Sequence, residues 1–269
     1  MHSYTRRLTF VFTAVLCLLS LGAAGLLTAA VLSGYDRKLH HFASSNGFAA
    51  AAAAFCVLGV LVSLAFSICF RQMKTAAAPA HSTPVLFAGA LVGFLLLFSF
   101  IFDIPSAETW MERIRLAMMA LSAFCFLIPV LQPNSFTAAR ALLSLTPILY
   151  TFLSVMDVYF DSSMGMNAPL KAYYLMMYLS MALFFTVQAR LALQRVKAPS
   201  YCLLAGFCVI LAGAVGIPHI VFALQGYELP LTLRESILCT AIAVYAALSL
   251  FSLREVPEST PSEEVQENA

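Results

Sequence analysis

Two aspartates one helical turn apart, Asp157 and Asp161, are the residues of this sequence best placed to bind a charged ligand. Their i, i+4 spacing puts both carboxylates on one face of a helix. They lie at the end of an apolar segment, 141–160, where an ionisable side chain is costly if the segment lies in lipid and therefore marks a candidate site. Carboxylates in this position would attract a cation or a cationic solute.

Further acidic residues recur at the ends of apolar segments. Four connections begin with an aromatic residue followed by an acid: Tyr35-Asp36, Phe102-Asp103, Phe160-Asp161 and Tyr227-Glu228. With His219, which follows Pro218 near the end of another segment, the candidate solute- or ion-binding residues are Asp157, Asp161, Asp36, Asp103, Glu228 and His219. The alternative is that the aromatic–acid pairs are interfacial anchors and that His219 is a hydrogen-bonded interfacial histidine rather than a proton relay or ligand.

The same charges suggest a structural role. The acids lie at the carboxyl ends of predicted helices, and the bases lie at the amino ends of the helices that follow. Each charge interacts unfavourably with the helix dipole, at a cost of roughly 0.3–1 kcal/mol. Ion pairs across each hairpin would offset these terms. The spacing predicts the pairs Asp103–Arg113 and Asp161–Lys171.

Known catalytic motifs are missing from the sequence. Residues 157–161 match the DxxxD motif of membrane prenyltransferases, but those enzymes need two such motifs to hold Mg²⁺ against a diphosphate, and only one is present. No HExxH, Walker loop or GxSxG motif occurs, and the seven cysteines lack metal-ligand spacing. We therefore expect no enzyme activity, no cofactor and no metal site.

The composition places these residues in a membrane protein. Hydrophobic residues make up 61% of the 269 residues, charged residues only 10%, and the mean hydropathy is +0.89. Soluble domains carry about 45–50% apolar and about 25% charged residues. The net charge of +2, without a basic run, excludes a nucleic-acid partner, so the expected partners are the lipid bilayer and a membrane protein or a second copy of the chain.

Eight segments are long and apolar enough to cross a bilayer, which requires about 20 residues. We expect transmembrane helices at 8–33, 48–70, 85–102, 116–132, 141–160, 172–189, 201–224 and 237–253. With the N-terminus inside, nine Lys and Arg residues fall on the inner side and six on the outer side, which favours this orientation. The Glu-, Pro- and Ser-rich tail, 254–269, is predicted to be disordered and cytoplasmic.

The segments also show an internal repeat. Asp103 and Asp161 are 58 residues apart, and so are Arg113 and Lys171 and the Met-Met pairs at 118–119 and 176–177. The aromatic–acid pairs of the two halves are 125 residues apart. These offsets indicate four helical hairpins, with the alternative that apolar helices resemble one another by composition.

The run from Phe160-Asp161 through Met166-Asn167 and Pro169 to Lys171, followed by a helix ending in Ala189-Arg190, resembles a loop of uncharacterised multi-pass membrane proteins from Gram-positive gut bacteria. The step Gly34-Tyr35-Asp36 is similar to their first outer loop. The resemblance implies a bacterial plasma membrane and implies no activity.

The predicted fold is therefore an all-α, polytopic bundle of about eight transmembrane helices, arranged as four hairpins, with both termini cytoplasmic. The predicted function is transport of a small or cationic solute through an acidic vestibule on the outer face. The alternative is a non-catalytic membrane subunit, sensor or scaffold that acts through helix–helix contacts with a partner.

Overall fold

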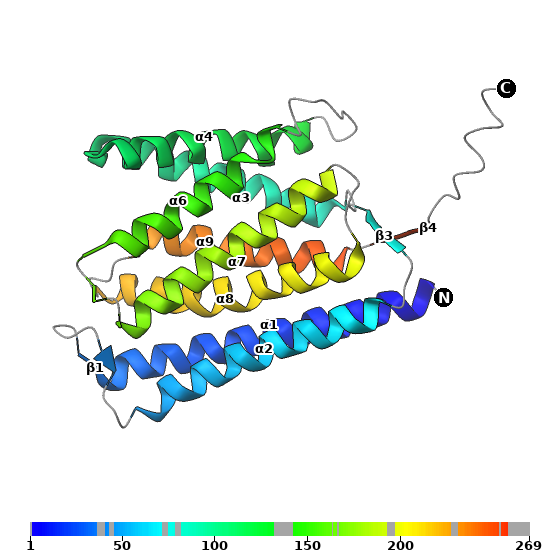
Figure 1. Cartoon of the computed structure of the whole chain (residues 1–269), viewed down its shortest axis with the longest axis horizontal. Coiled ribbons are helices and arrows are strands. Elements are labelled where there is room, and N and C mark those ends of the chain that lie inside the picture. Colours follow the sequence, from blue (N-terminus) through cyan, green and yellow to red (C-terminus); the bar gives the residue numbers. More distant parts are fainter. Residues whose placement is uncertain are drawn as a thin grey trace.

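The computed structural model describes residues 2–36, 41–42, 46–71, 75–78, 82–131, 142–162, 164–165, 167–192, 197–226, 231–252 and 254–257. Its long elements are all helices: α1 (His2–Gly34), α2 (Gly47–Arg71), α3 (Thr83–Asp103), α4 (Trp110–Leu131), α6 (Thr146–Phe160), α7 (Pro169–Ala192), α8 (Ala198–Leu224) and α9 (Leu233–Phe251). The short elements are the 3₁₀ turn η1 (Ile104–Ser106) and the strands β1 (Tyr35–Asp36), β2 (His41–Phe42), β3 (Thr75–Ala78) and β4 (Arg254–Pro257). Figure 1 shows the resulting helical bundle, and the all-α prediction is confirmed.

Seven of the described helices are long and apolar enough to span a membrane. The shortest of them, α9, has 19 residues and is about 28 Å long at 1.5 Å per residue, close to the thickness of a hydrocarbon core. Many large apolar side chains on these helices are exposed, which in lipid is their favourable environment. The chain is an integral membrane protein.

The fifth predicted span is the shortest helix of the bundle. Helix α6 has 15 residues and begins beside Pro147, which has no backbone N–H and cannot donate to the carbonyl of Leu143. The hydroxyl of Thr146 donates to that carbonyl instead, at 2.7 Å. A single turn, in which Leu145 N–H donates to the Leu142 carbonyl, precedes the helix. Proline therefore divides the apolar segment that the sequence presents as continuous.

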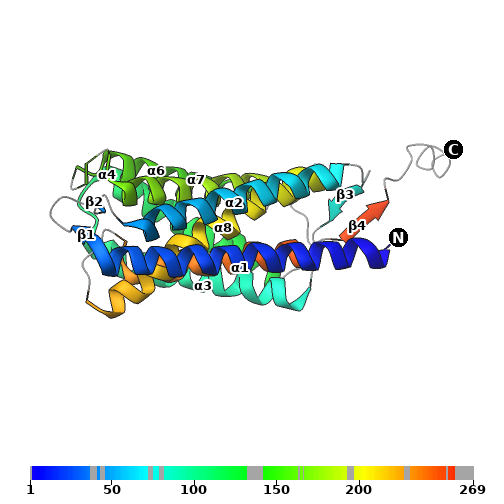
Figure 2. The ribbon, with the colours of Figure 1, turned by 90° about the horizontal axis from the view of Figure 1, so that it is seen from below.

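Six helices pack as a closed circuit, which we call the six-helix ring. Each of α3, α4, α6, α7, α8 and α9 packs on the next, and α9 packs back on α3. The α1–α2 hairpin lies outside the ring against α8, and in Figure 2 α4, α6 and α7 lie on one side of the bundle and α1 and α3 on the other. Helix α8 is the most deeply buried element because α1, α2, α7 and α9 all contact it.

Small residues on α8 allow this close packing. A Cβ added at Gly206 would lie 2.5 Å from Ser63 Oγ of α2, and one added at Gly216 would lie 2.6 Å from Thr240 Oγ1 of α9. The hydroxyl of Ser20 on α1 donates to the Val209 carbonyl at 3.0 Å. Close contacts of small residues and hydrogen bonds between helices are the interactions that hold helices together in lipid.

The two termini of the described chain lie at the same end of the bundle (Figure 1). There β4 pairs antiparallel with β3, from Thr75 opposite Pro257 to Ala78 opposite Arg254. This pairing corrects the prediction of disorder for the first four residues of the tail, because the connection between α2 and α3 supplies them with a main-chain partner. Residues 258–269 lie outside the described residues.

Candidate functional site

A capping box opens helix α4 on the side of the bundle opposite to the termini. The backbone N–H of Glu112 donates to Thr109 Oγ1 at 3.2 Å, and the N–H of Thr109 donates to Glu112 Oε2 at 3.0 Å. This reciprocal pattern satisfies two N–H groups that the first turn of a helix leaves without partners. It fixes the start of α4, and Arg115 follows one turn later.

A second capping box opens α9. The N–H of Thr232 donates to Glu235 Oε2 at 3.0 Å, and the N–H of Glu235 donates to Thr232 Oγ1 at 3.2 Å. The other oxygen of the same carboxylate, Glu235 Oε1, lies 3.6 Å from Arg115 Nη1. Glu235 therefore fixes the start of its own helix and contacts a cation on α4.

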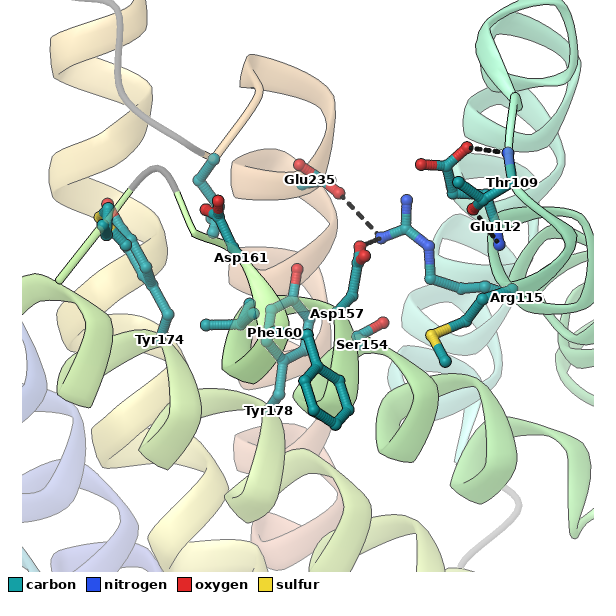
Figure 3. Close-up of a pocket in the computed structure, with 14 residues that line it drawn as sticks. Thr109, Glu112, Arg115, Ser154, Asp157, Phe160, Asp161, Tyr174, Tyr178 and Glu235 are labelled. Atoms are coloured by element: carbon teal, nitrogen blue, oxygen red, sulfur yellow. Dashed lines mark hydrogen bonds and ion pairs between the residues drawn. The ribbon is translucent and has the colours of Figure 1, made fainter. Parts of the chain in front are cut away.

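Arg115 also forms an ion pair with α6. Its Nη1 lies 3.0 Å from Asp157 Oδ2, so that one guanidinium joins carboxylates from two helices (Figure 3). The side chains of Arg115 and Glu235 are 17% and 14% exposed, whereas that of Asp157 is 41% exposed. Asp157 is thus the member of this triad most accessible to a solute.

These residues line a cavity of about 420 Å³ between α4, α6, α7 and α9. Its walls are Thr109, Met111, Glu112, Arg115, Ser154, Asp157, Val158, Phe160, Asp161, Met164, Tyr174, Tyr178, Leu231 and Glu235. A volume of this size lies in the range of small-molecule sites. Four carboxylates and one guanidinium line it, so acidic side chains predominate among its charged lining residues.

One wall of the cavity is backed by a buried histidine. Tyr174 lines the cavity, and its hydroxyl oxygen lies 2.6 Å from His219 Nε2. His219 Nδ1 lies 2.7 Å from the carbonyl oxygen of Val215. Because a carbonyl only accepts hydrogen bonds, Nδ1 carries the proton, and in the neutral ring Nε2 accepts from Tyr174. His219 is therefore a hydrogen-bonded residue behind the cavity wall and does not line the cavity.

A buried lysine positions the loop at the rim. Lys171 is only 2% exposed. Its Nζ donates to the main-chain carbonyls of Asp161 at 2.7 Å and of Met164 at 3.2 Å. Asp161 and Met164 both line the cavity, so Lys171 fixes part of its wall from behind.

An aromatic cluster fills the ring further along the same helices. Phe126 of α4 contacts Phe185 and Tyr245 with ring centroids 5.7 and 5.5 Å apart, and Phe184 contacts Tyr245 and Tyr201 at 5.9 and 6.5 Å. Phe126 lies eleven residues beyond Arg115, about 16 Å along the helix axis. The charged cavity and the aromatic cluster therefore occupy successive levels of the ring.

The structure brings together only some of the predicted site residues. Asp157 and Asp161 both line the cavity, as their spacing suggested. Asp36, in β1, does not line it, and neither does Asp103. Glu228 lies outside the described residues.

The predicted ion pair of Asp103 with Arg113 is replaced by a different one. Asp103 Oδ1 lies 2.8 Å from Arg234 Nη1, and the guanidinium of Arg234 also stacks over the ring of Phe102, with Cζ 5.3 Å from the centroid. The carboxyl end of α3 and the amino end of α9 are adjacent in the ring, while Arg113 is exposed. The Phe102-Asp103 pair thus joins two helices distant in sequence. In the second predicted pair, Lys171 does contact Asp161, through the main-chain carbonyl.

Sequence reasoning missed Arg115, Glu112 and Glu235, as well as Tyr174 and Tyr178 of α7. The pattern T-x-x-E at 109–112 and at 232–235 was the available signal, because it is the signature of a capping box. It would have placed both glutamates at helix starts on the same side of the bundle.

Among the described residues, no three His, Cys, Asp or Glu side chains converge in a way that could hold a metal ion. No protein family, curated protein or solved structure matches the chain.

Proposed function

We propose that the chain binds a small cationic solute in the acidic cavity and transports it across the membrane. One observation carries this proposal: a cavity of about 420 Å³ is lined by four carboxylates against a single guanidinium. Carboxylates gathered in one cleft concentrate negative potential there and raise the local concentration of cations. The half-exposed Asp157 is the residue that would receive the cation first.

The arrangement of the ring supports transport over binding alone. The cavity lies among four of the six ring helices, and the aromatic cluster fills the level beneath it. A helix ring that holds a cavity at one level and packed aromatic side chains at the next is the arrangement expected of one state of an alternating-access cycle. Movement of the aromatic cluster would open the cavity towards the opposite side.

The charge distribution supports an outward-facing cavity. Under the orientation favoured by the basic residues, the side that carries the cavity faces outward, because both termini lie at the opposite end. The resemblance of the α6–α7 connection to loops of bacterial multi-pass proteins supports a bacterial plasma membrane. The proposed direction is therefore uptake or exchange at the cell surface.

Purified protein in lipid nanodiscs tests the binding step. Titration with butylamine, monitored by isothermal calorimetry at fixed ionic strength, should show saturable binding that Asp157→Asn weakens at least about tenfold. The matched control is Asp36→Asn, which removes an outer carboxylate that does not line the cavity. Absence of amine binding by the folded protein, with a stoichiometric partner copurifying from the native membrane, would favour the non-catalytic subunit instead.

A further inference from the structure

His219 is an ionisable side chain enclosed within the bundle. It lies on α8, the most deeply buried helix, and is 1% exposed. An ionisable residue inside a membrane-spanning helix is energetically costly and is by default a candidate functional site. His219 does not line the cavity, so cation binding in the cavity does not account for it.

A single side chain separates the His219 ring from the cavity. Tyr174 of α7 lines the cavity, and its hydroxyl oxygen lies 2.6 Å from His219 Nε2. The two rings pack edge to face with centroids 5.1 Å apart, and the ring of Phe222 lies 5.6 Å from that of His219. The second ring nitrogen, Nδ1, lies 2.7 Å from the carbonyl oxygen of Val215. The hydroxyl of Tyr174 is therefore the polar connection between His219 and the cavity.

This pair can form its hydrogen bonds in both protonation states of the ring. In the neutral ring, the hydroxyl of Tyr174 donates to Nε2. In the imidazolium, Nε2–H donates to the same oxygen, because a phenolic oxygen also accepts, and Nδ1–H keeps its bond to Val215. The hydroxyl proton of Tyr174 then turns towards the cavity. Protonation of His219 thus redirects one O–H bond and leaves both ring nitrogens hydrogen-bonded.

The same hydroxyl provides a route for the proton. A hydronium ion in the cavity protonates Tyr174 Oη while the tyrosine passes its own proton to His219 Nε2, which leaves water, neutral tyrosine and imidazolium. Release is the reverse of this step. No group is oxidised or reduced, and the tyrosine is unchanged at the end.

The structure shows the pair in a closed state. Tyr174 is 0% exposed, and a charge on a ring without contact with water is costly, so His219 is neutral in this state. Pro218, immediately before His219, has no N–H with which to donate to the Ala214 carbonyl, and α8 can bend at such a position. Bending at Pro218 would separate α8 from α7 and admit water to the pair.

Few charges surround the pair. Residues 20–34 of α1 and 47–55 of α2 contain no side chain that titrates, and His219 forms no ion pair with any described side chain. Glu235 and Tyr35 interact electrostatically with Tyr174. The charged or titratable groups at this end of the neighbouring elements are Lys171, Tyr173 and Tyr178 of α7, Arg234, Glu235 and Cys239 of α9, Cys56 of α2 and Tyr35 of β1.

We propose that His219 is a proton-binding site coupled to the cavity through Tyr174, and that the chain exchanges protons for cations. The coupling rests on the proposed function, whereas the proton site does not. A proton on His219 and a cation in the cavity lie on either side of Tyr174, and like charges repel strongly where water is scarce. Closure around a cation therefore expels the proton, and by linkage a proton on His219 weakens cation binding.

Nitrogen NMR of the imidazole ring tests the proton site. Replacement of His2, His40, His41 and His81 by Gln leaves His219 as the single labelled ring in the full-length protein in nanodiscs. Without amine, we expect the neutral ring with its proton on Nδ1 at pH about 8, and a growing share of imidazolium as the pH falls to about 5. Saturating butylamine should lower the ratio of imidazolium to neutral ring at least about fivefold at a given pH.

Proton counting tests the coupling. Calorimetric titration with butylamine in phosphate and in Tris, two buffers with different ionisation enthalpies, gives the number of protons released per amine bound. At the pH where the ring is half protonated, we expect about half a proton. His219→Gln keeps an acceptor oxygen for Tyr174 but takes up no proton, and it should reduce the release to near zero. His41→Gln, in β2 and outside the cavity lining, should leave the release unchanged.

The outcomes separate this inference from the proposed function. If the ring stays neutral down to pH about 5 with and without butylamine, the proton site is overturned. If the ring takes up a proton but butylamine neither changes its protonation nor releases protons, the coupling is overturned and the cation cavity stands. If the folded protein binds no butylamine, the proposed function and the coupling both fail, and titration of the ring alone decides the proton site.

Discussion

The guanidinium of Arg115 lies 3.0 Å from the carboxylate of Asp157 and thereby joins α4 to α6 in the wall of the cavity. The same nitrogen lies 3.6 Å from Glu235 on α9. Arg115 therefore occupies the position that a cationic solute would take at Asp157. Under the proposed function, Arg115 and the solute would compete for the Asp157 carboxylate, and that competition would limit the affinity of the site for the solute.

Replacement of this arginine should have opposite effects on stability and binding. Arg115→Met removes both ion pairs and leaves Asp157 and Glu235 without their cation, at a cost of about 1–2 kcal/mol, since both carboxylates keep some contact with water. It should also tighten the binding of amines, because Asp157 becomes available. Thermal unfolding and calorimetry measure the two effects.

Arg113→Met is the matched control for Arg115→Met, because Arg113 lies on the same helix with an exposed side chain. It should leave both the unfolding temperature and amine affinity near their original values. Equal behaviour of the two variants would show that Arg115 is a surface charge without a role at the cavity.

The hydrogen bond between Tyr174 and His219 should stabilise the contact between α7 and α8. Tyr174→Phe leaves His219 Nε2 as a buried acceptor without a donor, which costs about 1–3 kcal/mol. Tyr173→Phe removes the hydroxyl of a neighbouring, partly buried tyrosine and serves as the control. A drop in unfolding temperature confined to Tyr174→Phe is expected; equal drops would contradict the assigned hydrogen bond.

Removal of the buried ammonium of Lys171 should loosen the rim of the cavity. Lys171→Met leaves the carbonyls of Asp161 and Met164 without their donor, so the turn in which Ala168 N–H donates to the Gly165 carbonyl should open more readily. Faster hydrogen exchange at the Ala168 amide, by about tenfold or more, is the expected readout. Lys197→Met, at the exposed start of α8, should leave that rate unchanged.

The pair of Asp103 and Arg234 should behave as a charge pair between α3 and α9. Reversing either charge alone should lower stability by about 1 kcal/mol, because each side chain is only partly exposed to water. The double variant, Asp103→Arg with Arg234→Asp, should recover most of the loss. Arg113→Asp combined with Asp103→Arg tests the hairpin pair that the sequence suggested. If Arg113→Asp restored the stability lost in Asp103→Arg, this result would contradict the pairing seen in the structure.

Local sequence predicted that two carboxylates lie together at the end of α6. Asp157 and Asp161 share a helix face because of their spacing alone, and both line the cavity. The partners of Asp157 were not predictable from spacing, because Arg115 and Glu235 are 42 and 78 residues away in the sequence and reach it only when α4, α6 and α9 pack together. The capping boxes at Thr109 and Thr232 are local, and the sequence alone could have identified them.

The sequence by itself determined that the chain is a helical membrane protein. The apolar content and the length of each run are local properties. A long apolar run in lipid forms a helix because its backbone N–H and C=O groups must form hydrogen bonds within the segment. Even the interruption at Pro147 follows from one residue, because proline cannot donate the hydrogen bond that a continuous helix requires.

Only the tertiary structure decided which charges meet. Hairpin spacing predicted Asp103 with Arg113, but closure of the six-helix ring places Asp103 against Arg234, 131 residues away in the sequence. Lys171 and Arg113 occupy equivalent positions in the sequence repeat, yet one is buried and the other exposed. The partner of each charged side chain depends on which helix faces pack together. In lipid, helix packing is determined by close contacts of small residues and by hydrogen bonds between distant segments, and not by the hydropathy of any one segment.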